Sequence, residues 1–293
     1  MSALEVAVPS RDRLGECPVW DDRTGTLWRV DAVAGAVLAV EVTSGAERRY
    51  DVGRHVGSVV LTDDPRQVLL AAQGGFHRLD LSSREVDLLA PLHEHDTDLL
   101  LNDGACDPAG RFVAGTMRRD ARPGRAGLYR YAPPSDVVPL LAGAGVSNGL
   151  CWSDDGAVLY WIDTLLGRVE RLGYDVQTGT VTSRAPAFDL TRFAGAPDGM
   201  AIDAQGCLWV AFWRGGAVRR FDPDGRLLDE VRVPVLRTTS CCLGGHDLRD
   251  LYVTTARQSV RDAPRDVEPW AGAVLRVRVD VPGLPVRRWD PTA

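Results

Sequence analysis

The sequence predicts an all-β fold, a six-bladed β-propeller, because one strand–turn–strand unit recurs six times along its 293 residues. Each unit has a short apolar strand, a polar turn rich in Asp and Gly, and a second strand rich in aromatic and β-branched residues. That order is typical of a β-hairpin. The units are ECPVWDDRTGTLWRVD from Glu16, GSVVLTDDPRQVLLAAQ from Gly57, NDGACDPAGRFVAGTM from Asn102, SNGLCWSDDGAVLYWID from Ser147, PDGMAIDAQGCLWVAFW from Pro197 and TTSCCLGGHDLRDLYVTTA from Thr238.

A second hairpin start follows each unit and begins at a glycine. These glycines lie at positions 35, 75, 127, 167, 216 and 272, so successive starts are 40, 52, 40, 49 and 56 residues apart. Two hairpins in such an interval make the four strands of one propeller blade. No helical stretch interrupts the pattern, and the 30 glycines and 18 prolines would break most candidate helices.

The repeat favours one domain over residues 1–293 rather than two β-sandwiches, since a sandwich has no reason to repeat one motif in register. We expect the N-terminal strand LEVAVP, residues 4–9, to complete the last blade beside PVRRW, residues 285–289. Closing the ring in this way protects a sheet edge that would otherwise be exposed.

Composition excludes several classes of function. The chain has 34 basic and 40 acidic residues, with no lysine, so no basic face for a nucleic acid is indicated. No apolar run is long enough to span a bilayer, and the start MSALEVAVPSRD lacks the features of a secretion signal, so we expect a cytoplasmic protein. The six cysteines show no C-x-x-C spacing and predict buried, reduced thiols rather than a zinc site or disulfides.

Four blades carry a polar side chain at one position of the repeat, five residues before the polar residue that opens the turn. These residues are Glu16, Asn102, Asn148 and Asp198. The first strand of a propeller blade runs along the central channel, so residues just before it should surround one mouth of that channel. Oxygen ligands converging there are what hard divalent cations prefer. The alternative, that these side chains cap turns or bind channel water, stays open at this point.

Several motifs, in order over nearly the whole chain, closely resemble the SMP-30/gluconolactonase/luciferin-regenerating (regucalcin-like) family. They are GECPVWD, NDGACDPAGRFVAGTM, SNGLCWSDDGAVLYWIDT, PDGMAIDAQGCLWVAFW, TTSCCLGGHDLRDLYVTTAR and PWAGAVLRVRVDVPGLP. The resemblance implies a six-bladed propeller that holds one divalent metal ion, calcium, zinc, manganese or magnesium, and hydrolyses sugar lactones. It also implies that Glu16, Asn148 and Asp198 bind the metal and that Asn102 contacts the substrate.

The implied chemistry suits a lactone. A bound cation would polarise the ring carbonyl and stabilise the oxyanion as water adds. Asp198 would take the proton from that water and return it to the departing ring oxygen. This catalytic role rests on the resemblance more than on first principles, because a carboxylate that also binds a metal should have a low pKa.

The sequence departs from the family at one substrate position. Family members typically read Arg-x-Asn-Asp-Gly, whereas LLLNDG places Leu100 where the Arg would contact sugar hydroxyls. An apolar side chain there removes the donors of a guanidinium and predicts an altered substrate. The acidic substrate contact of the family has a counterpart in Asp120, in a short Arg-rich loop.

Three functions remain in view from the sequence. The first is metal-dependent hydrolysis of a small-molecule lactone or ester by a monomer or small homo-oligomer that binds neither nucleic acid nor membrane. The second is a metal- or calcium-binding propeller without turnover. The third is a propeller recruited to a non-hydrolytic step such as a cyclisation or isomerisation.

Overall fold

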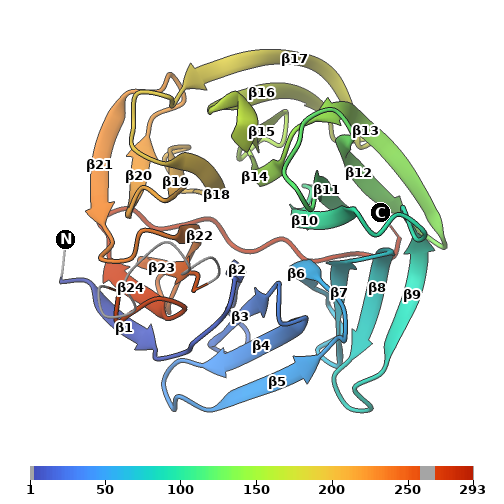
Figure 1. Cartoon of the computed structure of the whole chain (residues 1–293), viewed down its shortest axis with the longest axis horizontal. Helices are drawn as coiled ribbons and strands as arrows, with labels where there is room; N and C mark the ends of the chain where they lie inside the picture. The colour runs from blue at the N-terminus through green and yellow to red at the C-terminus, as the bar shows by residue number, and fades with distance from the viewer. Residues whose placement is uncertain (1–2, 258–267, 293) are drawn as a thin grey trace.

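The computed structural model describes residues 3–257 and 268–292 and has six four-stranded antiparallel sheets arranged in a ring (Figure 1). This arrangement confirms the predicted six-bladed propeller. Within the described ranges the single helix is the 3-10 helix η1 (Thr164–Leu166). No helix in this part of the chain is long and apolar enough to cross a membrane.

Blades 1 to 3 follow one another along the chain, and each sheet keeps its strands in sequence order. Blade 1 has β2 (Gly15–Asp21), β3 (Thr26–Asp31), β4 (Ala36–Glu41) and β5 (Glu47–Asp51). Blade 2 has β6 (Val56–Leu61), β7 (Gln67–Ala72), β8 (Gly75–Asp80) and β9 (Val86–Pro91). Blade 3 has β10 (Leu99–Cys106), β11 (Phe112–Arg118), β12 (Ala126–Ala132) and β13 (Asp136–Ala144).

Blades 4 to 6 repeat this order, except that the last blade takes its outer strand from the N-terminus. Blade 4 has β14 (Ser147–Trp152), β15 (Val158–Asp163), β16 (Arg168–Asp175) and β17 (Thr180–Asp189). Blade 5 has β18 (Ala196–Ile202), β19 (Leu208–Trp213), β20 (Ala217–Phe221) and β21 (Leu227–Arg232). Blade 6 has β22 (Thr238–Gly244), β23 (Asp250–Thr255), β24 (Val274–Arg278) and β1 (Glu5–Val8).

The hydrophobic core lies between neighbouring blades rather than in one central mass. Trp28 and Tyr50 of blade 1, for example, belong to the same buried cluster as Leu70 and Leu79 of blade 2. The second strand of a blade has neighbours on both faces, so β3 is buried along its whole length, whereas the outermost strand β5 is mostly exposed. The apolar second strands noted in the sequence are therefore required by packing on two sides.

The ring is closed by the N-terminal strand, as predicted, but with a different partner. β1 pairs with β24, Glu5 lying opposite Arg276, and not with the segment PVRRW. β22, β23 and β24 already supply three strands of blade 6, and Pro285 removes a backbone donor that a ladder at PVRRW would need. The predicted pairing was therefore wrong.

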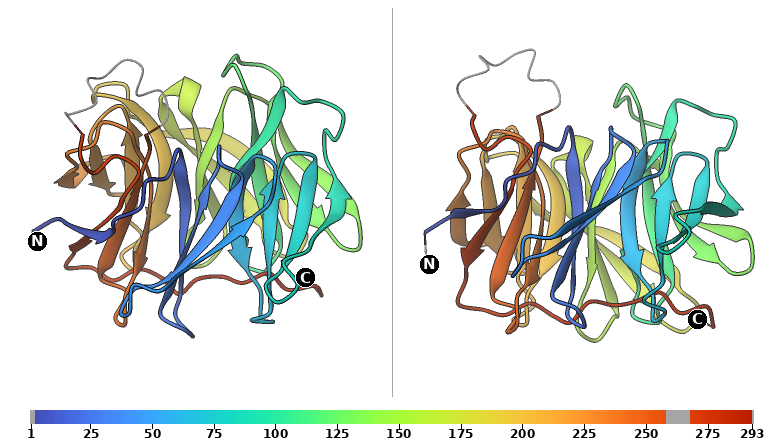
Figure 2. Two further views of the ribbon diagram at one scale, coloured as in Figure 1. Left: turned by 60° about the horizontal axis from the view of Figure 1, so that its bottom comes forward. Right: turned by 90° about the horizontal axis from the view of Figure 1, so that it is seen from below.

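The C-terminal segment crosses the end of the channel instead. It runs along one face of the ring, shown in red below the strands in Figure 2. The Gly283 amide donates to Leu248 O at 2.7 Å, and the Trp289 amide donates to Leu61 O at 2.8 Å. The segment thus joins blade 6 to blade 2 across the channel.

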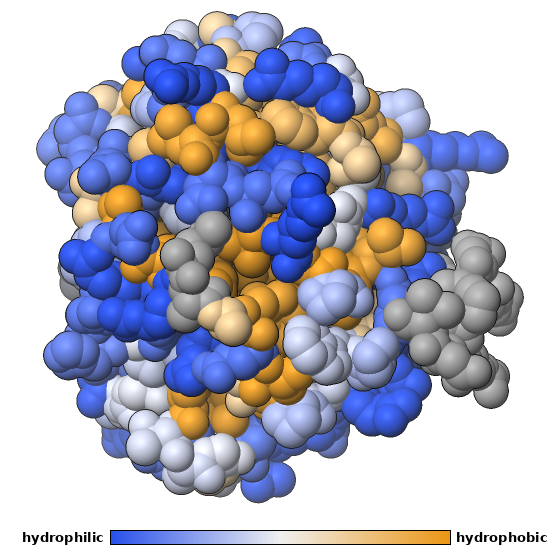
Figure 3. Space-filling view, turned by 90° about the vertical axis from the view of Figure 1, so that its left-hand side faces the viewer, coloured by the Kyte–Doolittle hydropathy of each residue, from blue (hydrophilic) through white to orange (hydrophobic). Residues whose placement is uncertain are grey.

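The outer surface is mixed in character. In the side view of Figure 3, hydrophobic patches are separated by hydrophilic side chains. The large hydrophobic side chains exposed among the described residues are Leu88, Leu165, Leu166, Leu227, Leu228 and Leu236. They come from blades 2, 4 and 5 and the loop after blade 5, so they do not all belong to one surface.

Trp289 should anchor the crossing segment. It is 9% exposed and stacks on Tyr131 with ring centroids 6.3 Å apart. Trp289→Ala is expected to lower the free energy of unfolding by about 3 to 5 kcal/mol, measured by urea denaturation. Trp289→Phe should cost less, because the indole Nε1 has no hydrogen-bond partner in the described structure to lose. Thr292→Ala, at an exposed position of the segment, is the control. Equal stability of Trp289→Ala and wild type would contradict this role.

Candidate functional site

Every innermost strand has an irregular pairing register at the same level of the ring. The strands are β2, β6, β10, β14, β18 and β22, which contact one another around the channel. In five of them the aligned residue has no ladder partner, and these residues are Gly57, Asn102, Asn148, Asp198 and Thr239. In β2 the unpaired residues are Cys17 and Pro18, directly after Glu16, and Cys17 has a positive φ of 45°. Such bulges bend a strand and redirect its side chains.

The aligned residues therefore lie within the innermost strands, at bulges, and not in the loops before them as the sequence analysis expected. We call these six residues the channel ring: Glu16, Gly57, Asn102, Asn148, Asp198 and Thr239. The strands are close here. A Cβ added to Gly57 would lie 2.4 Å from the carbonyl oxygen of Asn102, and one added to Gly149 would lie 2.8 Å from that of Asp198. Small residues thus bring the oxygen-bearing side chains together.

Three carboxyl groups interact at the channel ring, two from ring residues and one from Asp103, which follows the ring residue Asn102. Burial raises the pKa of Glu16 well above its usual range, and the charges of Asp198 and Asp103 raise it further. Burial and Asp103 likewise raise the pKa of Asp198. Burial raises the pKa of Asp103 to about 6, opposed by a hydrogen bond from the Gly104 amide. Glu16 and Asp198, predicted from separate blades, are therefore close enough to affect each other's ionisation.

These carboxylates lack a compensating positive charge. No Arg or His among the described residues forms an ion pair with Glu16, Asp103 or Asp198. Buried carboxylates are normally paired or bound to a metal, so the donor chemistry fits a divalent cation. Within the described ranges no group of three or more His, Cys, Asp or Glu residues is placed to hold a metal. A cation here would consequently need an amide oxygen beside the two carboxylates.

The ring amides are joined by hydrogen bonds across blades 3, 4 and 5. Asn102 Nδ2 donates to Ser147 O and to Asn148 Oδ1, both at 2.8 Å. Asn148 Nδ2 donates to Thr164 Oγ1 at 2.8 Å, and Thr164 Oγ1 donates to Pro197 O at 2.8 Å. Backbone carbonyls only accept hydrogen bonds, so Ser147 O and Pro197 O fix the orientation of both amides. Asn148 therefore presents its oxygen on the side away from Thr164.

Two participants were missed by the sequence analysis, Asp103 and Thr164. Regular strand alternation would point Asp103 away from Asn102, and the bulge at this pair removes that alternation. Thr164 lies in η1 after the second strand of blade 4, outside the aligned position. The adjacent Asn-Asp of NDG was the only sequence signal for Asp103, and no signal identified Thr164.

The predicted substrate residues lie in different surroundings. Leu100 is 4% exposed, is paired with Met117, and precedes Asn102 by two residues on β10. Asp120 lies beyond the end of β11 on an exposed turn, where Arg118 binds its carboxylate in a bidentate ion pair at 2.8 and 2.9 Å. Arg119 donates instead to Thr97 O at 3.3 Å. Substrate contacts by Leu100 and Asp120 stay predictions.

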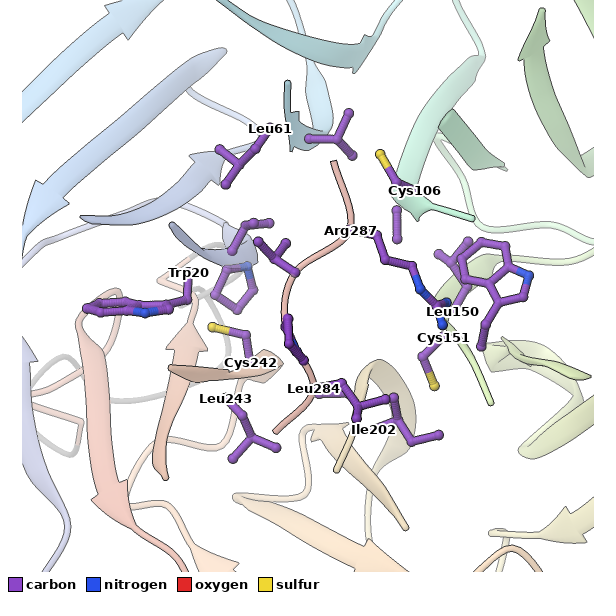
Figure 4. Close-up of a pocket in the computed structure, with 18 of the residues that line it drawn as sticks. Trp20, Leu61, Cys106, Leu150, Cys151, Ile202, Cys242, Leu243, Leu284 and Arg287 are labelled. Atoms are coloured by element: carbon purple, nitrogen blue, oxygen red, sulfur yellow. The ribbon is translucent and has the colours of Figure 1, made fainter. Parts of the chain in front are cut away.

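A cavity of about 190 Å³ lies at the opposite end of the channel from the ring (Figure 4). It is lined by residues that follow the ring positions along the innermost strands and is covered by Leu284–Arg287. None of the predicted metal or substrate residues lines it. Its walls are mainly apolar and include Cys106, Cys151 and Cys242. All six cysteines are free, and all but Cys242 are buried.

Residues 14–257 match the family described as the SMP-30/Gluconolactonase/LRE-like region. The chain belongs to this family. It is 36% identical over 296 residues to regucalcin of Xenopus laevis, covering 99% of this chain and 97% of that protein. It is 37% identical over 289 residues to regucalcin of Danio rerio, covering 96% of each.

Two solved structures of related proteins have nearly the same fold. A calcium-binding protein, regucalcin of Agrobacterium tumefaciens, has a TM-score of 0.93 at 29% identity, covering 98% of this chain and 97% of that chain. A luciferin-regenerating enzyme has a TM-score of 0.92 at 28% identity, covering 98% of this chain and 99% of that chain. The family resemblance of the sequence motifs is thereby confirmed over the whole propeller.

The buried Asp103 should make the metal-free protein less stable as the pH rises. Its pKa of about 6 in the folded chain exceeds that of an unfolded Asp, near 3.8, so the folded state binds more protons between these values. Stability should fall through this window. In chelator, the unfolding free energy of Asp103→Asn relative to wild type should increase by roughly 2 kcal/mol from pH 4 to pH 8. Parallel pH profiles for the two proteins would disprove the assignment.

Proposed function

We propose that this family member is a metal-dependent hydrolase that opens a lactone, with Glu16, Asn148 and Asp198 as the metal ligands. One observation carries the proposal: buried carboxylates from different innermost strands interact without any described cationic side chain to pair them. The membership of the SMP-30/Gluconolactonase/LRE-like family supports lactone chemistry.

The donor set favours a hard cation. Carboxylate and amide oxygens suit Ca²⁺, Mg²⁺ and Mn²⁺ better than a site rich in Cys or His would, and zinc is the least suited of the four candidates. The Agrobacterium relative is described as a calcium-binding protein, which supports calcium first. When bound, such a cation would polarise the lactone carbonyl and stabilise the oxyanion.

The remaining chemistry falls to side chains of this chain. The Asp198 carboxylate would accept the proton of the attacking water and return it to the ring oxygen that leaves. The Asn102 amide, whose hydrogens already bind Ser147 O and Asn148 Oδ1, has its own Oδ1 to accept a substrate hydroxyl. Leu100, two residues before it, would provide an apolar contact where family members have an Arg.

Asp198→Asn tests the proton-transfer role. The amide can still bind a cation through its oxygen but cannot accept the proton from water, so kcat should fall on the order of 100- to 10,000-fold. Turnover would be measured on sugar, aliphatic and aromatic lactones with added Ca²⁺, Mg²⁺, Mn²⁺ or Zn²⁺, and bound metal by equilibrium dialysis. Activity within a few-fold of wild type in a metal-bound Asp198→Asn would contradict the role.

The same screen separates the alternatives. Turnover by wild type that a chelator abolishes supports a metal-dependent enzyme. Metal binding without turnover of any lactone favours a binding propeller or a recruited non-hydrolytic step. The absence of binding for all four cations would contradict the proposed metal site itself.

Leu100→Arg tests substrate choice. Wild type should prefer a simple aliphatic lactone to a polyhydroxylated hexonolactone, since an apolar wall leaves hydroxyl groups without donors. The Arg variant should shift the ratio of kcat/KM toward the hexonolactone by at least about tenfold, equal to about 1.4 kcal/mol. Leu100→Met, a swap that conserves volume, is the control and should keep the wild-type ratio. A wild type that already favours the hexonolactone would remove the specificity argument.

A further inference from the structure

The short helix η1 is held rigidly beside the channel ring. Asp163, at its N-cap, accepts hydrogen bonds from the amides of Gly145 at 2.8 Å, Val146 at 3.0 Å and Leu165 at 3.2 Å. Gly167, at its C-cap, has the left-handed φ of 63°, and its amide donates to Thr164 O at 3.1 Å. Both ends of the turn are thus fixed, and the approach to the innermost strand β14 is fixed with it. Thr164 has a defined place relative to Asn148.

The Thr164 hydroxyl has one hydrogen to donate, and it donates that hydrogen to Pro197 O. It can therefore only accept from Asn148, and it does so from Nδ2 at 2.8 Å. The amide nitrogen of Asn148 is held toward η1 and the amide oxygen is held away from it. Pro197 directly precedes Asp198, so one hydroxyl connects the innermost strands that carry two of the proposed metal ligands.

Two other ring residues donate a hydrogen bond directly to a backbone carbonyl of the next blade. Asn102 Nδ2 donates to Ser147 O of blade 4 at 2.8 Å, and Thr239 Oγ1 donates to Gly15 O of blade 1 at 2.6 Å. In each case the accepting carbonyl belongs to the residue just before the ring position of the next blade. Blade 4 differs, because Thr164 makes this contact in place of Asn148.

The register places one residue at the position of Thr164 in every blade. In blade 4, Ser147 directly precedes the ring residue and pairs with Asp163, and Thr164 is the next residue after Asp163. The same rule gives these counterparts in the other blades: Ala32, Gln73, Met117, Trp213 and Ala256. None of them has a hydroxyl group. The bridging contact is therefore particular to the blade whose ring residue is the proposed amide ligand.

We propose that Thr164 is a positioning residue that orients the Asn148 amide oxygen toward a divalent cation, an inference that rests on the proposed metal site. Removing the hydroxyl leaves Asn148 Nδ2 without its acceptor and Pro197 O without its donor. Among the described residues, the amide then keeps the hydrogen bond that its oxygen accepts from Asn102 Nδ2 but loses the one that holds its nitrogen away from the cation. Loss of such a supporting contact typically lowers metal affinity 10- to 100-fold.

The test compares Thr164→Val, which keeps the shape and removes the hydroxyl, with Thr164→Ser, which keeps the hydroxyl. Ca²⁺ and Mn²⁺ affinities would be measured by calorimetry on the full chain after chelator treatment. We expect Kd to rise 10- to 100-fold in Thr164→Val and to stay within about threefold of wild type in Thr164→Ser. If Thr164→Val does not fold, Thr164→Ala makes the same comparison.

Thr254→Val controls for a general loosening of the channel ring. The Thr254 hydroxyl bonds Thr239 Oγ1 at 2.8 Å in blade 6, so its loss is comparable but distant in the ring from Asn148. This variant should keep the wild-type Kd. Wild-type affinity in Thr164→Val, or an equal loss in Thr254→Val or Thr164→Ser, would overturn the inference. A wild type that binds neither cation would instead contradict the proposed function.

Discussion

The innermost strands cannot complete their hydrogen-bond ladders at the level where they come closest, and the site depends on this constraint. Each innermost strand is the edge strand of its sheet and has a bulge at this level, so carbonyls that face away from the ladder, such as Gly15 O and Ser147 O, need a donor from elsewhere. Side chains of the preceding blade supply it, from Thr239 and Asn102 respectively. Two polar residues of the channel ring, Asn102 and Thr239, therefore satisfy the backbone of the next blade, which is a structural role.

Among the described residues, the polar side chains of the ring that donate no hydrogen bond to the backbone of the next blade are the ones proposed to bind the metal. Asn102 and Thr239 donate directly to the next blade. Beside Asn148, the hydroxyl of Thr164 makes this donation instead. The carboxylates of Glu16 and Asp198 have no hydrogen to donate. The ring consequently combines an amide oxygen with carboxylates whose pKa values are raised by burial and by one another. Concentrating like charges in this way opposes folding of the metal-free chain. Such a cost is common at functional sites and is tolerated where binding a cation offsets it.

The sequence was sufficient to predict the architecture because the same strand–turn–strand pattern recurs in all six blades. Strand order, blade number and the alignment of Glu16, Asn102, Asn148 and Asp198 all follow from its period. The strand register at the ring could not be predicted. In a regular strand, side chains alternate between the two faces, so Asp103 would point away from Asn102. The bulge in β10 removes this alternation and places Asp103 near the ring carboxylates. The prediction of ring closure had the correct N-terminal strand but the wrong partner. The sequence did not show that β24 is already the third strand of blade 6, and it is β24 that pairs with β1. Thr164 depends on a contact between blades, which no local pattern specifies.

The mouth of the channel is chemically unlike the ring beneath it. The residues two places before the ring positions are Leu14, His55, Leu100, Val146, Ala196 and Arg237. Four of the six are apolar. His55 Nε2 lies 3.1 Å from Leu101 O, and burial lowers the pKa of His55 to about 4, so its imidazole is neutral at pH 7 and Nε2 carries the hydrogen. Arg118 is already bound by Asp120. Apart from Arg237, the residues at these six positions therefore present no charged side chain at pH 7. Under the proposed function, discrimination there would come from shape and apolar contact while the ring beneath acts on the reacting carbonyl. This separation would allow substrate choice to change at Leu100 without disturbing the proposed ligands.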